Sequence, residues 1–166
     1  SFEWEYYRVV LIEFKKKYIK NLSIENSQFI KYSLIEQIDL INSQNEDLYI
    51  ACELSDYQIG VIINAEKDDL NKLNRFASEI STFMFTNYFA SPVLTIGQVE
   101  TEPLSIWESL QGAKTLLDYK YFMPKKTILA ADILLIREDS TEKIPDKYFE
   151  SFQKALNLKN MELLKK

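Results

Sequence analysis

Apolar residues form a continuous run at residues 7–14, YRVVLIEF, in which β-branched side chains are frequent. Such a run is typical of a strand that is covered on both faces of a sheet. Over residues 26–41 the apolar positions recur at steps of three and four, which predicts an amphipathic helix. Its buried side is expected to carry Phe29, Ile30, Leu34, Ile38 and Ile41.

Two short apolar runs, at residues 48–54 and 58–65, follow this helix and are separated by Ser55, Asp56 and Tyr57. A short break of this kind between two strand patterns is typical of a tight turn. We therefore predict an antiparallel hairpin in this part of the chain.

Helices and strands alternate in the second half of the chain. Asp68 or Asp69 can cap a helix over residues 70–88. Residues 93–99 have a strand pattern, and Pro103 is suited to the first turn of the next helix. The inner face of that helix is predicted to carry Trp107, Leu110, Ala113, Leu116 and Leu117.

Two further elements are expected towards the C-terminus, a strand at residues 127–136 and a helix at residues 147–166. The order strand, helix, hairpin, helix, strand, helix, strand predicts an α+β fold. This is the ferredoxin-like, nucleotide-cyclase-like arrangement, in which helices pack on an antiparallel-containing sheet. The last helix is expected to be a C-terminal connector.

Composition fits one soluble domain, because 46% of the 166 residues are hydrophobic and can fill a core. The chain has a net charge of −5, whereas binding to phosphates requires an excess of basic residues. Direct contact with DNA is therefore not expected. No apolar run approaches the ~20 residues that span a bilayer, so this segment is expected to make no membrane contact. The single cysteine, Cys52, cannot form an internal disulfide, which fits a cytoplasmic location.

Missing residue types exclude several kinds of site. The chain has no histidine, which removes the usual catalytic triads and zinc sites. Its three glycines, Gly60, Gly97 and Gly112, form no phosphate-binding loop or dinucleotide fingerprint. Any catalysis would therefore have to use carboxylates, lysine, tyrosine or Cys52.

At the strands with VVLIEF and YQIGVII, and again at residues 109–122, the chain resembles the GGDEF-like domains that lie between the sensor and the helix-turn-helix of large AraC-type transcription regulators. The strand with VVLIEF and the strand with YQIGVII resemble the strands around the signature hairpin of diguanylate cyclases. Residues 109–122 resemble a helix of the degenerate, regulatory branch, through Ser109, Ala113, Leu117 and the run YKYF. Leu110 and Gly112 depart from that helix pattern.

The resemblance implies a lost active site. It aligns residues 55–59 with the signature Gly-Gly-Asp-Glu-Phe, and all five positions differ. Glu13 remains at the strand end where the family holds magnesium, but Lys15 stands at the next acidic position. Phosphoryl transfer depends on positioned charge, so the resemblance implies that this chain has no catalytic residues, no bound metal and no cofactor. A retained ligand cleft would be lined by Glu13, Lys15, Asp56, Tyr57 and Gln58.

The resulting hypothesis is a non-catalytic sensory or dimerisation module of an AraC-type regulator. Residues 1–138 would form the degenerate GGDEF-like domain, and residues 139–166 would connect it to a downstream DNA-binding domain. Its partners would be a second copy of itself and a small molecule, with DNA bound only through that further domain. The alternatives are a structural spacer, a small-molecule-binding α/β sensor of another signalling protein, and a cyclase-type enzyme. Turn chemistry alone can also explain Asp56, and Glu13 can be a simple salt-bridge partner.

Overall fold

The secondary-structure elements follow one another in the predicted order. The computed structural model describes residues 4–14, 24–45, 49–65, 69–119 and 128–130, all within the unit Ser1–Asp132. The elements are β1 (Arg8–Glu13), α1 (Ile24–Asn45), β2 (Tyr49–Ser55), β3 (Gln58–Ile63), α2 (Leu70–Tyr88), β4 (Val93–Ile96), the 3₁₀ turn η2 (Pro103–Ser105), α3 (Ile106–Tyr119) and β5 (Ile128–Ala130). The described strands and helices thus confirm the α+β fold class.

These strands form a five-stranded sheet in the order β2-β3-β1-β4-β5. β1 pairs antiparallel with both β3 and β4, so the first apolar run is a central strand, as predicted. β2 and β3 form the expected antiparallel hairpin, whereas β4 and β5 pair in parallel. The first four strands have the ferredoxin-like arrangement, and β5 extends it at one edge.

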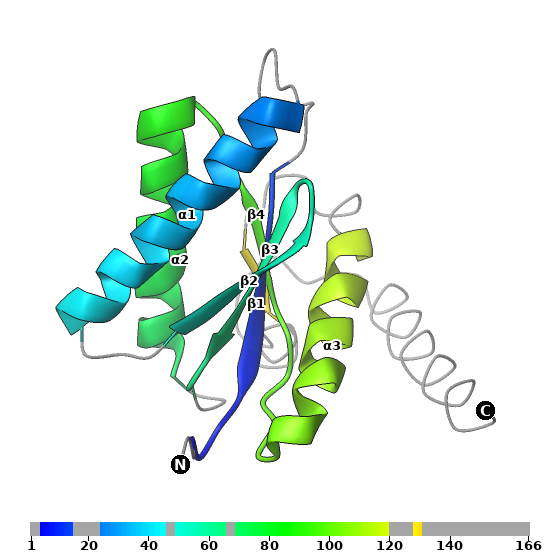
Figure 1. Cartoon of the computed structure of the whole chain (residues 1–166). Coiled ribbons are helices and arrows are strands. Elements are labelled where there is room, and N and C mark those ends of the chain that lie inside the picture. The colour runs from blue at the N-terminus through cyan, green and yellow to red at the C-terminus, as the bar shows by residue number, and fades with distance from the viewer. Residues whose placement is uncertain (1–3, 15–23, 46–48, 66–68, 120–127, 131–166) are drawn as a thin grey trace, which may run out of the picture. The chain divides into compact units, whose positions relative to one another are not determined.

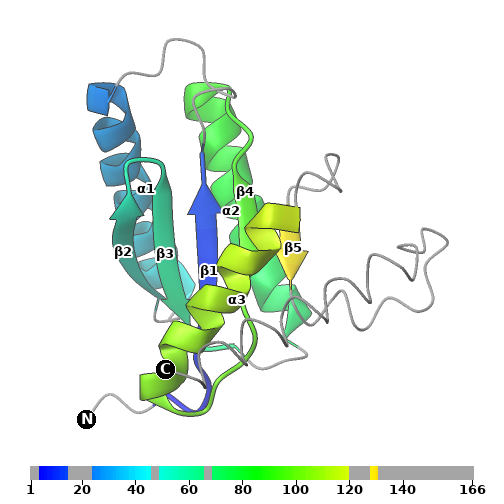
Figure 2. The same cartoon turned by 90° about the vertical axis from the view of Figure 1, so that its right-hand side faces the viewer.

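The helices lie on both faces of the sheet (Figure 1). α1 and α2 contact each other and cover one face, and α3 packs on β1 and β4 from the other side. Figure 2 looks onto the sheet from the α3 side and shows that α3 does not extend over the β2–β3 hairpin. β1 therefore lies between helices on both faces, which explains why all six of its residues are buried.

Two aromatic residues predicted to be buried lie on the outside of their helices. Phe29 is 66% exposed, while its neighbour Ile30 is buried as predicted. The buried face of α1 includes the polar residues Ser27 and Lys31. Phe29 therefore lies outside this face and is exposed. Trp107 is 57% exposed and makes a cation–π contact with Lys114, whose Nζ is 5.7 Å from the ring centroid. Both predictions were wrong because apolar spacing alone cannot recognise inward-facing polar residues.

Close contact between α3 and the sheet depends on Gly97 and Ser109. The Ser109 Oγ accepts a hydrogen bond from the Val9 backbone N–H (3.0 Å) and donates one to the Gln98 carbonyl (2.7 Å). A β-carbon added at Gly97 would collide with the Ser109 backbone carbonyl. Thr95 donates to the Ala113 carbonyl of α3 at 2.7 Å. Polar groups thus hold this helix against the strands at a distance that only glycine permits.

The start of α2 confirms the predicted cap. Asp69 is its N-cap, and its carboxylate accepts a hydrogen bond from the Lys72 backbone N–H at 3.3 Å. This contact satisfies one of the N–H groups that the first turn of a helix leaves without an intrahelical partner.

Several predictions lie outside the described residues. They concern most of the strand predicted at 127–136, the helix at 147–166 and the boundary between residues 138 and 139. Within the part of the chain that the structure describes, no helix is long and apolar enough to cross a bilayer.

We predict that Gly97→Ala will lower the free energy of unfolding by about 3 kcal/mol, because the new methyl group must displace the backbone of α3. Gly112→Ala is the matched control. Its methyl group would meet the end of the flexible Gln98 side chain, and alanine favours the helix by about 1 kcal/mol. Urea unfolding should show a large loss for the first variant and almost none for the second, and equal losses would contradict the proposed contact.

Candidate functional site at the β2–β3 hairpin

The hairpin turn consists of Asp56 and Tyr57, between the end of β2 and the start of β3. Two-residue hairpin turns usually need positive φ angles and hence glycine or asparagine. Among the described non-glycine residues, only Phe89 has a positive φ. The register of β2 and β3 instead shifts between Glu53 and Ser55, a bulge that bends the strand locally. The hairpin therefore closes without glycine, and its turn carries two side chains.

Glu13 and Gln58 lie opposite each other at the adjoining ends of β1 and β3. The Gln58 Nε2 donates a hydrogen bond to the Glu13 Oε2 at 2.8 Å, and Glu13 is buried. Leu11 on β1 pairs with Thr95 on β4, whose side chain contacts α3. Side chains two residues apart in a strand lie on the same face of the sheet, so Glu13 also lies on the α3 face. Glu13 and Gln58 are therefore two of the predicted site residues that the fold brings together, on the α3 side.

Tyr57 packs against the end of β1. Its ring meets the Phe14 ring edge to face, with 6.4 Å between the centroids and 81° between the planes. The Phe14 backbone N–H also donates to the Tyr57 carbonyl at 3.0 Å. Phe14 is buried, so this contact anchors the hairpin turn to the core.

Asp56 and Lys15 complete the predicted set. Asp56 is exposed in the turn, consistent with its interpretation as a turn-forming residue. Lys15 lies outside the described residues. The structure thus joins Glu13 to Gln58 and places Asp56 and Tyr57 in the adjacent turn.

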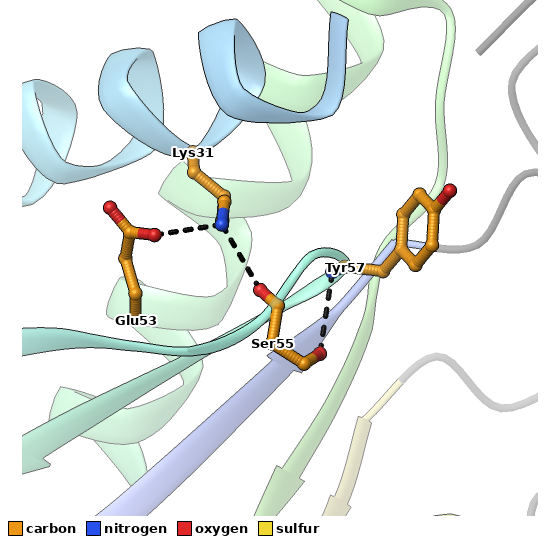
Figure 3. A network of polar contacts seen from close by, with 4 residues as sticks. All are labelled: Lys31, Glu53, Ser55 and Tyr57. Carbon is orange, nitrogen blue, oxygen red and sulfur yellow. Dashed lines mark hydrogen bonds and ion pairs between the residues drawn. The ribbon is translucent and has the colours of Figure 1, made fainter. Parts of the chain in front are cut away.

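Lys31 is a residue of this region that the pattern analysis did not identify. It lies on α1 and is buried, and its Nζ donates to the Glu53 Oε2 at 2.7 Å and to the Ser55 carbonyl at 3.2 Å (Figure 3). The available signal was a lysine at the inward position three residues before Leu34. Because both acceptors belong to the last residues of β2, Lys31 ties α1 to the hairpin just before its turn.

Glu53 and Glu13 lie on opposite faces of the sheet. Glu53 pairs with Ile59, whereas Glu13 pairs with Gln58, the adjacent residue of β3. Adjacent side chains of a strand point to opposite faces, so the Lys31–Glu53 ion pair is separated from the Glu13–Gln58 pair by the backbone of the sheet. Figure 3 also shows the Tyr57 ring directed away from the ion pair.

The described part of the chain was searched for groups of side chains that could hold a metal ion. It contains no group of three or more acidic, cysteine or histidine residues that could hold an ion. Its buried side-chain nitrogen and oxygen atoms all have hydrogen-bond partners. Buried polar groups that are already satisfied stabilise a fold and do not call for a ligand.

Cys52 lies on the edge strand β2 and is exposed. Its sulfur is 3.5 Å from the Gly60 carbonyl oxygen, to which it donates. Partial burial of this sulfur raises the pKa of the Cys52 thiol. A raised pKa keeps the thiol protonated at neutral pH, which disfavours its use as a nucleophile.

No protein-family model matches this chain, and no curated protein is significantly similar to it.

We predict that Glu53→Ala will cost about 1–2 kcal/mol of stability, because it deprives a buried ammonium of its carboxylate while the exposure of Glu53 moderates the loss. Lys31→Met should cost less, since methionine fills the same space and leaves Glu53 access to water. The double variant should be more stable than Glu53→Ala alone. Urea unfolding of the four proteins gives the coupling energy, and strictly additive effects would show that the pair does not interact.

Proposed function

We propose that this chain is a non-catalytic regulatory module, a sensory or dimerisation domain of an AraC-type transcription regulator. In this proposal the domain passes a signal to a DNA-binding domain that lies outside the 166 residues. Such a regulator acts in the cytoplasm, where the unpaired Cys52 is compatible with the reducing conditions.

The observation that carries the proposal is the Asp56–Tyr57 turn. A cyclase of the resembled type needs bare backbone at this turn, because side chains prevent close approach of the phosphates. Here the turn closes on two side-chain-bearing residues, and Tyr57 is packed against Phe14. These contacts support a packing role for the hairpin in preference to phosphate binding.

The Glu13–Gln58 contact gives independent support. A metal-binding carboxylate needs further anionic or carbonyl ligands around the same ion. The Glu13 carboxylate instead accepts a hydrogen bond from a side-chain amide that stands directly opposite. This pairing favours a structural role for the carboxylate that the resemblance would assign to magnesium.

We predict that the chain will not convert GTP to a cyclic dinucleotide in the presence of magnesium, because the turn and the metal ligands are unsuited to phosphoryl transfer. Chromatography of the reaction products tests this, with an active diguanylate cyclase as the positive control and a reaction without protein as the blank. Product above the blank would contradict the proposal and support a cyclase-type enzyme.

The variant Ser55→Gly/Asp56→Gly tests whether the turn residues alone prevent GTP binding or whether the residues around the turn contribute. We predict that it will not gain micromolar GTP binding, because Tyr57 and the Glu13–Gln58 pair remain in place. Isothermal titration calorimetry with GTP and magnesium measures this. Tight binding by the unmodified chain would contradict the proposal directly.

A further inference from the structure

β2 is an edge strand of the sheet, and the hydrogen bonds around it show which of its backbone groups point outwards. The Asn42 side chain accepts a hydrogen bond from the Tyr49 N–H (2.7 Å) and donates one to the Tyr49 carbonyl (2.9 Å). Both Tyr49 groups therefore point away from β3. Because this direction repeats at every second residue of an antiparallel strand, the backbone groups of Ala51 and Glu53 also point outwards. No other described strand lies beside them.

The pairing of β3 with β1 gives the same assignment. The Phe14 N–H donates to the Tyr57 carbonyl at 3.0 Å, so Tyr57 and every second residue after it direct their backbone groups towards β1. The residues between them, which include Gly60, direct theirs towards β2. Gly60 pairs with Cys52, so the backbone groups of Cys52 face β3 and those of its two neighbours face outwards.

The sequence of β2 does not protect this edge. Natural proteins often prevent pairing at an edge strand with lysine, proline or a bulge. β2 contains no lysine or proline, and its bulge begins only at Glu53. Asn42 occupies the edge at Tyr49 alone. The backbone between Tyr49 and the bulge is therefore available to a further strand.

Ile50, Cys52 and Leu54 form an apolar row on the α3 face of β2. Cys52 lies opposite Gly60, which pairs with Leu11 on that face. A β-carbon at Gly60 would lie 3.0 Å from the Leu54 Cδ1 and 3.4 Å from the Cys52 Sγ, so Leu54 shares this face. Ile50 is 41% exposed, and Figure 2 shows that α3 does not extend over the hairpin. An added strand would place every second side chain beside this row, where apolar side chains fit.

The exposed charges on the opposite face of this edge are acidic. Asn42 shows that one side of α1 reaches the edge, and Asp39, three positions before it, lies on that side of the helix and is exposed. The Glu53 side chain points to the same face, towards α1, and is 44% exposed. Lys31 is the only basic residue within residues 26–44 and 49–55, and it is buried against Glu53. Basic side chains on this face of an added strand would therefore meet carboxylates.

We propose that the β2 edge binds an extended peptide of a partner protein, in which apolar and basic residues alternate, as a further antiparallel strand. The peptide backbone bonds to Ala51 and Glu53, and its apolar side chains pack on the row of Ile50, Cys52 and Leu54. Its basic side chains lie opposite Ala51 and Glu53, on the acidic face. The antiparallel direction is favoured because it is the more stable pairing per residue. The inference does not depend on the proposed regulatory function.

A labelled peptide, acetyl-KVKVKVK-amide, serves as the probe and matches the 7 residues of β2 in length. Titration followed by fluorescence anisotropy should show saturable binding with a Kd of roughly 10–100 µM, as for a small contact of main-chain bonds and a few side chains. The peptide acetyl-KKVVVKK-amide has the same composition without the alternation, and should bind at least about tenfold more weakly.

N-methylated peptides test the backbone contact without any change to the protein. The lysines lie opposite Ala51 and Glu53, so their N–H groups face β2 and those of the valines face away. N-methylation of the lysines should therefore weaken binding by about tenfold or more. N-methylation of the valines is the matched control and should retain most of the affinity.

Ala51→Pro tests the same contact from the side of the protein. It removes an outward N–H that the pairing with β3 does not use, so the variant should keep its melting transition. Its affinity for the alternating peptide should fall by about tenfold or more. Ala51→Val keeps the N–H and should bind as tightly as the unmodified chain.

Three results would overturn the proposal: no saturable binding at about 1 mM peptide, equal binding of the two peptide sequences, or equal loss with either set of N-methyl groups. Unchanged binding by folded Ala51→Pro would do the same. Sedimentation that shows self-association abolished by Ala51→Pro, without peptide binding, would identify a second copy of the chain as the occupant and would also contradict it.

Discussion

The seating of α3 on the sheet is the constraint on which the rest of the described structure depends. The Ser109 hydroxyl joins the Val9 N–H to the Gln98 carbonyl, and Gly97 leaves room for the helix backbone. With α3 in this position, β1 is covered on both faces, which permits its uninterrupted apolar sequence. The contact also determines which side chains face α3, including Thr95 and the Glu13–Gln58 pair.

The hairpin is held from the opposite face by a different kind of contact. Lys31 reaches from α1 to Glu53 and Ser55, so a charged group fixes the last residues of β2. Tyr57 then packs on Phe14 at the end of β1. The hairpin is therefore anchored both to α1 and to the end of β1.

The hairpin end and the helical layer differ in the side chains that they leave exposed. The hairpin end, where the resemblance would place chemistry, is satisfied by contacts within the chain. The outer side of the α1–α2 layer retains exposed aromatic residues and a strained cap at Phe89. Exposed aromatic side chains are therefore found at the helical layer, whereas the buried polar groups of the hairpin end have partners within the chain.

The sequence by itself determined the order and type of the elements, because the strand and helix periods of the apolar residues differ and the turns between them are short. It also narrowed the cap of α2 to Asp68 or Asp69 and predicted the antiparallel hairpin, since both features depend on neighbouring residues. Glu13 and Gln58 could be named as candidates from the resemblance. Their hydrogen bond could not, because it depends on the register between strands that are 45 positions apart in the chain.

Only the tertiary structure decided which polar residues face inwards. Ser109 and Lys31 are polar, and polar residues usually lie at the surface. Both are buried here, because a partner from a distant element satisfies the hydrogen bonding of each side chain. Burying a polar group is costly unless such a partner is present, and its presence is a property of the assembled fold. Because the buried face of α1 includes Lys31, Phe29 lies on the exposed face of this helix. The spacing of apolar residues thus defined a helix, while the distant hydrogen-bond partners defined which of its faces is buried.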